Sequence, residues 1–376
     1  MGVRKIEAWH KAGVIDTATR DRLIAYEADH ARPIALWAVF GIGALAIGLG
    51  LVSVVAANWE DIPGRLRLAV HLALVAGALA TLGWRERELA GHSPYAVEAV
   101  LFVTGALGLT FLGHLGQVYQ TASPLWQPLL LWLGLFAPLL LATGRGWPAA
   151  GALMGVLVWA VWDYAGRGSQ AASTALALWL ALVTALPVLA GPVAGWLRGG
   201  SPRGPFWRQI EQLALAYAVA GGSLAAVFAS SDAFARPDML GSLAAMALRG
   251  AIGVAAGLAL IGLRPGKSGR MAGAIMAGAG LCLPLAYALS GSDILAAALF
   301  MALWTGIAAA AFTAGWRGVF QLAVGMIALR LIILSFELAS DLLLSGFGLI
   351  LAGLLILGIG WAALKVSRRF APEAAA

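Results

Sequence analysis

Residues 171–196 read AASTALALWLALVTALPVLAGPVAGW, a run without one charged side chain. A helix of about 20 apolar residues is long enough to cross the hydrocarbon core of a bilayer. Similar runs recur along the chain: hydrophobic residues make up 61% of the 376 positions and charged residues only 11%. Soluble domains carry about a quarter of their residues as charged ones. The sequence therefore predicts an all-α fold, a polytopic transmembrane helical bundle.

Short polar breaks divide the apolar material into twelve predicted spans. We place these spans at residues 35–57, 66–84, 95–113, 125–142, 147–164, 171–196, 209–230, 239–263, 271–289, 293–313, 317–337 and 342–364. The Gly/Pro-rich segment 197–208 is the longest internal hydrophilic break, and we interpret it as a cytoplasmic linker. It separates a first membrane half, 35–196, from a second half, 209–376, which ends in a short basic tail. Residues 1–34 are predicted to form two short amphipathic helices that break at Gly13 and are capped by Asp16.

Lysine and arginine are distributed unevenly over the predicted loops. With the N-terminus inside, 19 of the 25 basic residues fall on cytoplasmic segments and 4 on outer ones. The positive-inside rule then predicts a bacterial inner-membrane protein with both termini in the cytoplasm. The same distribution accounts for the net charge of +7, so this charge gives no reason to expect nucleic acid as a partner. The expected partner is the lipid bilayer, and the sequence leaves the oligomeric state open.

Arg249, Arg330 and Glu337 are charged residues of predicted spans and are candidate ligand or pathway residues. Arg249 lies ten residues into its span, and Arg330 is similarly deep. Glu337 follows Arg330 by seven residues, so both side chains lie on one face of a helix. A charged group at membrane depth needs a partner or a hydrated cavity. A structural ion pair and a role in binding a substrate or an ion both satisfy that need.

A second group of polar residues gathers on the predicted outer side of the first four spans. Its members are Glu60, Asp61, His71, His114, Gln117 and Tyr119. The segment 113–124, GHLGQVYQTASP, has no charged residue but many hydrogen-bonding groups, which is typical of a re-entrant or cavity-lining loop. The alternative is that the histidines are ordinary interface residues and that the carboxylates pair with Arg65 and Arg67.

Three segments resemble a known family. They are Trp9–Arg20 followed by AYE at 25–27, AANWE at 56–60, and GQVY at 116–119. On these motifs the chain resembles the bacterial polytopic membrane family called domain of unknown function 2157, over about its first 140 residues. The resemblance implies an integral inner-membrane protein with a cytoplasmic N-terminal helical segment. It implies no activity.

Motifs for standard chemistry are missing from the sequence. Cys282 is the only cysteine, which excludes an intramolecular disulfide and a cysteine-based metal site. Neither a GxxxxGK[ST] phosphate loop nor an HExxH zinc helix is present. His71 and His114 alone would make a weak metal site. We therefore expect no metal and no cofactor, name no catalytic residue, and favour a role other than catalysis.

Three functions remain open on the sequence. The first is a transporter-like or flippase-like protein with a polar site toward the periplasmic side. The second is a membrane scaffold or regulator that docks a cytoplasmic protein through residues 1–34. The third is a transferase that acts on a lipid-linked substrate with Glu60 and Asp61, although the first outer loop is short for such an enzyme.

Overall fold

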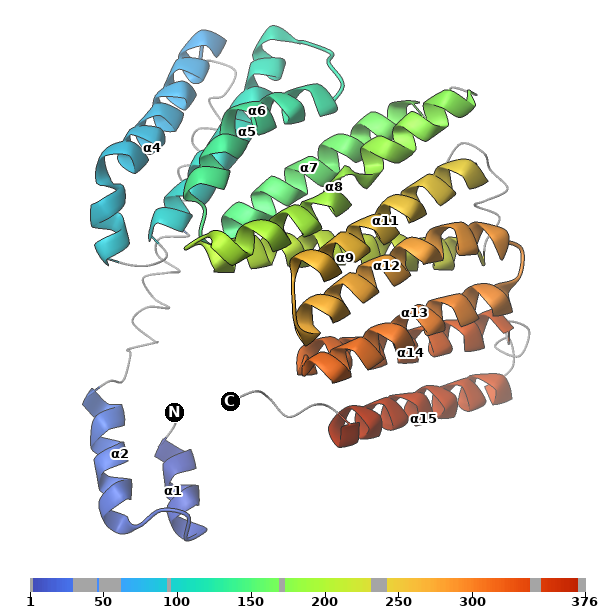
Figure 1. Cartoon of the computed structure of the whole chain (residues 1–376). Coiled ribbons are helices and arrows are strands. Elements are labelled where there is room, and N and C mark those ends of the chain that lie inside the picture. The colour runs from blue at the N-terminus through green and yellow to red at the C-terminus, as the bar shows by residue number, and fades with distance from the viewer. Residues whose placement is uncertain are drawn as a thin grey trace. The chain divides into compact units, whose positions relative to one another are not determined.

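The computed structural model describes residues 3–29, 46, 62–92, 96–168, 173–230, 242–338 and 346–370 (Figure 1). The regular elements in these ranges are α-helices. Contacts divide the chain into two units, Met1–Arg67 and Leu68–Ala376, and each unit has its own packing. The helical fold predicted from the apolar runs is confirmed.

The first unit contains a helical hairpin of α1 (Val3–Lys11) and α2 (Thr17–Asp29). Gly13 has φ +69°, a left-handed conformation that suits glycine and lets the chain reverse between the helices. Ile6 of α1 is 1% exposed and forms the apolar centre of the hairpin. The break expected at Gly13 is therefore present.

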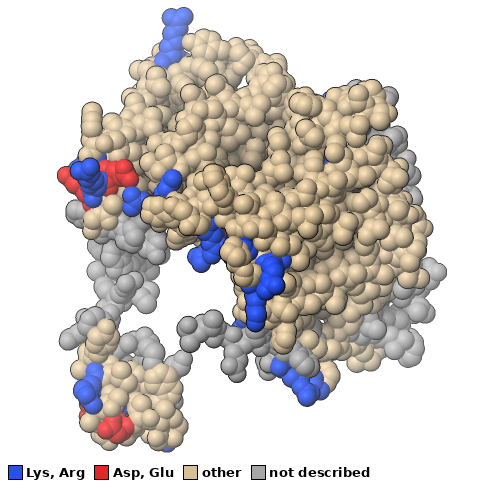
Figure 2. Space-filling view, viewed as in Figure 1, with Lys and Arg blue, Asp and Glu red and all other residues tan. Residues whose placement is uncertain are grey.

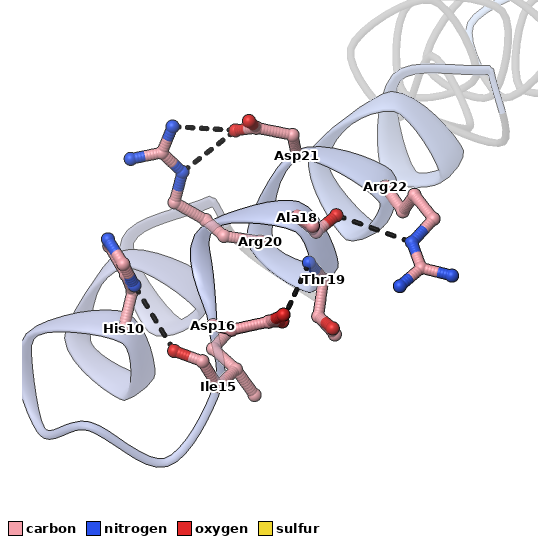
Figure 3. A network of polar contacts seen from close by, with 8 residues as sticks. All are labelled: His10, Ile15, Asp16, Ala18, Thr19, Arg20, Asp21 and Arg22. Atoms are coloured by element: carbon pink, nitrogen blue, oxygen red, sulfur yellow. Dashed lines mark hydrogen bonds and ion pairs between the residues drawn. The ribbon is translucent and has the colours of Figure 1, made fainter.

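Polar contacts fix the turn of this hairpin (Figure 3). The Nδ1 atom of His10 lies 3.2 Å from the carbonyl oxygen of Ile15. Asp16 caps α2, because its carboxylate accepts a hydrogen bond of 2.9 Å from the backbone N–H of Thr19. Hydrogen bonds from the side chain and backbone of Thr19 hold the pKa of Asp16 below its usual value. The predicted cap is thus confirmed.

The second unit is built from long apolar helices. Their bounds are α4 (Gly64–His92), α5 (Ala96–Tyr119), α6 (Trp126–Thr143), α7 (Trp147–Gly168), α8 (Thr174–Gly200), α9 (Gly204–Phe228), α11 (Leu243–Leu263), α12 (Lys267–Ala288), α13 (Asp293–Ala314), α14 (Arg317–Leu338) and α15 (Gly346–Phe370). Within the described ranges, 10 helices are long and apolar enough to cross a membrane. The predicted span 35–57 lies outside the described residues except for residue 46, and the predicted span 342–364 corresponds to α15.

Helices α8, α9, α11 and α12 form the centre of the second unit. Helix α11 packs against α8 and α12, and α9 packs against α8 and α12 (Figure 1). Helices α5, α6 and α7 pack on one another, and α13, α14 and α15 follow α12 in order. Glycine and alanine are abundant at the buried positions of the central helices, and small residues let membrane helices approach closely.

The contact between α11 and α12 is a close approach of two backbones. A Cβ atom added at Gly257 would lie 2.5 Å from the carbonyl oxygen of Gly273, and one at Gly280 would lie 2.8 Å from that of Gly250. Gly253 faces the same contact, with the Cα of Gly280 at 2.9 Å from its added Cβ. Side chains at these positions would push the helices apart.

We expect Gly280→Ala to destabilise the protein relative to Gly278→Ala on the same helix. Both changes raise helix propensity equally, but an added Cβ meets backbone atoms at Gly280 and nothing within 4 Å at Gly278. The difference in unfolding free energy should be at least about 1 kcal/mol. Thermal denaturation of the purified variants measures it, and equal midpoints would contradict the close contact.

The predicted linker 197–208 is mostly helical. The segment between the two helices is therefore shorter than predicted. Helix α8 runs to Gly200 and α9 begins at Gly204, so Ser201–Arg203 alone lie between them. The physical reason is the position of Pro205, which lies in the first turn of α9. Proline is tolerated there because the first N–H groups of a helix have no intrahelical acceptor. A Gly/Pro-rich stretch therefore begins a helix here.

The predicted polar loop 113–124 is also partly helical. Helix α5 continues to Tyr119 and ends in a Schellman motif, in which the N–H of Thr121 donates to the oxygen of Gly116 at 3.0 Å. The N–H of Gln120 donates to the oxygen of Gln117 at 3.4 Å. The loop prediction failed because nothing in 113–119 breaks a helix: hydrogen-bonding side chains are tolerated on an exposed helical end.

We expect Gln120→Gly to stabilise the end of α5. Gln120 has φ +49°, a left-handed conformation that favours glycine and costs other residues about 1 kcal/mol. The gain should be roughly 0.5–1 kcal/mol after the greater chain entropy of unfolded glycine is subtracted. The matched variant Gln117→Gly, inside the helix, should destabilise instead. A lower thermal midpoint for Gln120→Gly would contradict the assignment.

Candidate functional site

Arg249 lies on α11, seven residues after Ser242, which caps the helix. That spacing places it about 10 Å along the helix. The Nε atom of Arg249 donates a hydrogen bond of 2.9 Å to the hydroxyl of Thr184 on α8, and Nη1 lies 3.7 Å from the sulfur of Met246. Arg249 is half-buried, whereas Thr184 is 3% exposed. The deep arginine predicted from the sequence therefore meets a buried hydroxyl of another helix.

Thr184 joins this contact to a longer network. Its hydroxyl donates to the carbonyl oxygen of Leu180 at 2.8 Å and so has lone pairs left for Arg249. Its own carbonyl oxygen accepts from the hydroxyl of Tyr217 on α9 at 2.6 Å. The indole N–H of Trp162 on α7 donates to the Tyr217 hydroxyl at 3.0 Å. We call Trp162, Thr184, Tyr217 and Arg249 the Arg249 network; it joins four helices.

Sequence reasoning found Arg249 but missed its three partners. A single threonine, tyrosine or tryptophan within an apolar run is common, because these side chains are compatible with membrane helices. A signal was nevertheless available near Thr184, since Pro187 follows it by three residues inside α8. Proline at 187 leaves the carbonyl of Val183, the neighbour of Thr184, without its helical donor, and polar side chains often gather at such positions.

Arg330 lies in a different place, on α14. It is 2% exposed, and its Nη2 atom donates to the hydroxyl of Ser230, just after α9, at 3.2 Å. Ser230 in turn donates to the carbonyl oxygen of Val227 at 2.7 Å. Arg330 therefore ties α14 to the end of α9, a contact that supports the packing of the bundle.

The predicted partner of Arg330 and the predicted outer acids have no described side chains. Glu337 belongs to α14, but its side chain lies outside the described residues. Glu60 and Asp61 also lie outside them. Gln117 and Tyr119 are exposed near the end of α5. Among the described residues, both side chains therefore lie at the surface.

His71 and His114 do come together, between α4 and α5. Their Nδ1 atoms are 3.4 Å apart and their ring centroids 5.7 Å apart. The Nε2 atom of His71 lies 3.0 Å from the carbonyl oxygen of Leu107. Because a carbonyl oxygen only accepts, Nε2 of His71 carries the hydrogen, and a neutral His71 accepts from His114 at Nδ1. The histidines expected to share a site are thus hydrogen-bonded neighbours.

Two further residues of α5 contact this histidine pair. Phe111 meets the ring of His71 edge-on with centroids 5.5 Å apart, and the Thr110 hydroxyl lies 3.3 Å from Nε2 of His71. His114 is 9% exposed. Among the described residues, no group of three His, Cys, Asp or Glu side chains could hold a metal ion. The contacts join α4 to α5.

Two buried acids were missed by the sequence interpretation. Glu98 at the start of α5 is 5% exposed, and its carboxylate accepts from the N–H groups of Arg145 and Ala149 at 2.9 and 2.8 Å. It therefore caps the beginning of α7, where the helix dipole favours negative charge. Glu86 binds the Arg145 side chain at 3.0 Å. Glu98 thus fixes the turn between α6 and α7.

The second buried acid is Glu211 on α9, which is 3% exposed. Its Oε1 atom pairs with Nη1 of Arg264 at the end of α11. Its Oε2 atom lies 3.6 Å from Nη1 of Arg198 near the end of α8. One carboxylate thus joins two arginines from two other helices.

One family model matches part of the chain. Residues 7–149 match the family model of DUF2157, a predicted membrane protein. The match confirms the resemblance that the motifs of the first 140 residues indicated, and the chain is a multi-pass membrane protein. The matched part includes His71, His114 and Glu98, but not Arg249, Arg330 or Glu211.

A curated protein is also similar in sequence to part of the chain. Heme A synthase of Rhodopseudomonas palustris (strain BisB5) is 31% identical over 182 residues, which cover 42% of this chain and 50% of that protein. The chain therefore matches about half the length of this relative. No solved structure matches the chain.

Proposed function

We propose that the chain is a transporter-like or flippase-like protein of the bacterial inner membrane that moves an anionic amphiphile, with both termini in the cytoplasm. The observation that carries the proposal is the Arg249 network. Arginine keeps its positive charge in proteins, and a charge inside an apolar bundle is a functional-site hypothesis by default. The anionic group of the transported amphiphile would bind at Arg249.

The network supports entry from the side of the bundle. Trp162 is 46% exposed, whereas Thr184 at the other end of the hydrogen-bonded chain is 3% exposed. Polar groups therefore continue from the lipid-facing surface of α7 to the interior beside α11. An amphiphile could keep its chains in lipid while its headgroup reaches Arg249. Under the predicted orientation, Arg249 lies in the outer half of α11, toward the periplasm.

Prolines next to the network support a change of helix shape. Pro187 and Pro192 lie inside α8, and Pro284 lies inside α12 beside Gly250. Proline removes a helical hydrogen bond and bends a helix. Interrupted helices line the substrate sites of many transporters. Helix α8 carries both Thr184 and two prolines, so bending it would move the site.

The test is lipid flipping by the purified chain in liposomes. Fluorescently labelled phosphatidylglycerol on the inner leaflet becomes reducible by external dithionite when it is flipped. We expect Arg249→Gln to slow this by roughly tenfold or more, since a hydrogen bond to a charged group is worth about 1.5–3 kcal/mol. The control Arg317→Gln removes an exposed charge at the start of α14 and should leave the rate unchanged.

Three results would decide against the proposal. Equal rates for Arg249→Gln and Arg317→Gln would show that Arg249 is not part of the site. Equal rates for labelled phosphatidylglycerol and phosphatidylcholine would show that the chain does not select anions. Equally fast lipid flipping in liposomes without protein would show that the chain has no flipping activity.

Because the curated relative is a heme A synthase, we compare the geometry of His71 and His114 with the geometry that haem ligation needs. Haem iron is held by histidine nitrogen in many proteins, and such bonds are about 2.0 Å long. Two axial ligands thus need about 4.0 Å between their nitrogens, with the porphyrin plane between them. The facing Nδ1 atoms are 3.4 Å apart, and Nε2 of His71 is bound to Leu107. The two facing nitrogens therefore do not fit as the two axial ligands of one haem in this arrangement.

A scaffold role is the second candidate, and the α1–α2 hairpin favours it. Val14 and Tyr26 are 70% and 61% exposed on this small folded unit. Under this proposal these exposed side chains contact the protein partner. Deleting residues 3–29 should then abolish the cellular phenotype while flipping in liposomes stays unchanged. The two proposals are thus separable by one truncation.

A further inference from the structure

Basic side chains gather where α8, α9, α11 and α12 begin or end. The segments 197–211 and 264–270 contain six of them, Arg198, Arg203, Arg208, Arg264, Lys267 and Arg270, and a single acid, Glu211. In Figure 2 several blue side chains gather at one edge of the second unit, and most of the visible face of that unit is tan. We call these six residues the basic cluster.

Three members of the basic cluster are held in place by the protein. Glu211 pairs with Arg264 and lies 3.6 Å from Arg198. Nη2 of Arg264 also donates to the hydroxyl of Ser268, at the start of α12, at 3.2 Å. Arg203 donates to the carbonyl oxygen of Leu141, and its guanidinium carbon lies 5.8 Å from the centre of the Trp207 ring. Positive groups fixed in this way bind an anion at a smaller entropy cost than mobile ones.

The cluster keeps a large excess of positive charge. Glu211 can neutralise only one of its two arginines, although both side chains are partly buried, at 15% for Arg264 and 30% for Arg198. Arg208, Lys267 and Arg270 are exposed on neighbouring turns. The N-terminus of α12 begins in this region, after Gly266 with φ +101°, and adds N–H donors. The arrangement therefore favours a ligand with negative charge.

Apolar side chains beside the cluster indicate which anion. Val193 and Trp196 on α8 are 53% and 65% exposed, and Leu263 on α11 is 43% exposed. They lie near the same ends of α8 and α11 as Arg198 and Arg264. Tryptophan is enriched at the level of lipid headgroups. A ligand that covers both surfaces needs an anionic head and hydrocarbon chains.

We propose that the basic cluster binds the headgroup of an anionic phospholipid, with the phosphate beside the exposed Arg208, Lys267 and Arg270, in the positive field of Arg198 and Arg264, and the acyl chains along Val193, Trp196 and Leu263. Under the predicted orientation this lipid belongs to the cytoplasmic leaflet. The site is separate from Arg249 and does not depend on flipping. Basic sites between transmembrane helices on this side of the membrane bind anionic lipids in other proteins.

The test measures lipid binding to the full chain in detergent. Native mass spectrometry with phosphatidylglycerol and phosphatidylcholine gives the two dissociation constants. Each basic residue near a membrane surface contributes roughly fivefold to the binding of an anionic lipid. The triple variant Arg208→Gln, Lys267→Gln, Arg270→Gln should therefore bind phosphatidylglycerol at least roughly tenfold more weakly. Binding of phosphatidylcholine should not change.

The matched control is Arg85→Gln, Arg87→Gln, Arg317→Gln. It removes three exposed charges from the same predicted side of the membrane and should bind phosphatidylglycerol as the unchanged chain does. Equal losses in the two triple variants would overturn the proposal, because general attraction to the protein's charge would then explain binding. If soluble glycerol phosphate stabilised the protein as much as the lipid does, this would also overturn the proposal, since the acyl chains would then contribute nothing to binding.

Measuring lipid binding to the unchanged chain at several salt concentrations tests the same proposal without a variant. The preference for phosphatidylglycerol over phosphatidylcholine should fall as salt rises, because salt screens exposed charges. No preference at low salt would overturn the proposal. Loss of the site should leave the effect of Arg249→Gln on flipping unchanged, so this proposal and the proposed function can fail separately.

Discussion

Replacing Glu211 with alanine should lower the free energy of unfolding by about 3–5 kcal/mol, the range typical of a broken buried ion pair. Glu211 is 3% exposed and meets Arg264 and Arg198. Its removal leaves two partly buried guanidinium groups facing each other without the carboxylate between them. Chemical denaturation of the purified protein in detergent micelles measures the loss.

Two variants make this result specific to the buried pair. Glu211→Gln keeps an acceptor for Arg264 but loses the charge, so its cost should lie between that of alanine and zero. Glu86→Ala breaks the ion pair with Arg145, whose side chains are 39% and 47% exposed, and should cost less than about 1 kcal/mol. Equal costs for Glu211→Ala and Glu86→Ala would mean that Glu211 does not hold α9 to its neighbours.

The helices of the bundle could be predicted from hydropathy, but several of their ends could not. Within the described ranges, α6 and α7 begin and end within a few residues of the predicted spans. Long apolar runs leave a helix as the one way to pair backbone groups in lipid. At Pro205 and Tyr119 the polar or Gly/Pro-rich sequence suggested loops, yet helices continue, because helix ends tolerate both kinds of residue.

The candidate site could be predicted only in part, since its partners come from different helices. Arg249 was found because charge is rare at membrane depth. Nothing in one sequence pairs Arg249 on α11 with Thr184 on α8, because that contact depends on how the helices pack. The prediction that His71 and His114 lie near each other rested on loop topology alone, and the structure confirms it. Glu98 and Glu211 were overlooked because they lie near predicted span ends, where an acid is usually solvated.

Replacing Thr184 with valine should cost about 1.5–3 kcal/mol, the value of a hydrogen bond to a charged group. Valine keeps the branched shape but removes the hydroxyl that accepts from Nε of Arg249 at 2.9 Å. Thr184→Ser restores the hydroxyl and should recover most of the stability. Tyr217→Phe, which leaves the contact between Arg249 and Thr184 in place, should cost less. Thermal denaturation of the purified variants gives the order.

A double-mutant cycle separates the hydrogen bond from the packing of Thr184. In a chain that already carries Arg249→Met, Thr184→Val no longer leaves a charged donor without its acceptor, so its cost should fall well below the value in the unchanged chain. The same valine should slow lipid flipping only where Arg249 is present, because Thr184 acts by holding the guanidinium. If the cost of Thr184→Val is equal in both backgrounds, Thr184 does not position Arg249, and the anion site must lie elsewhere in the bundle.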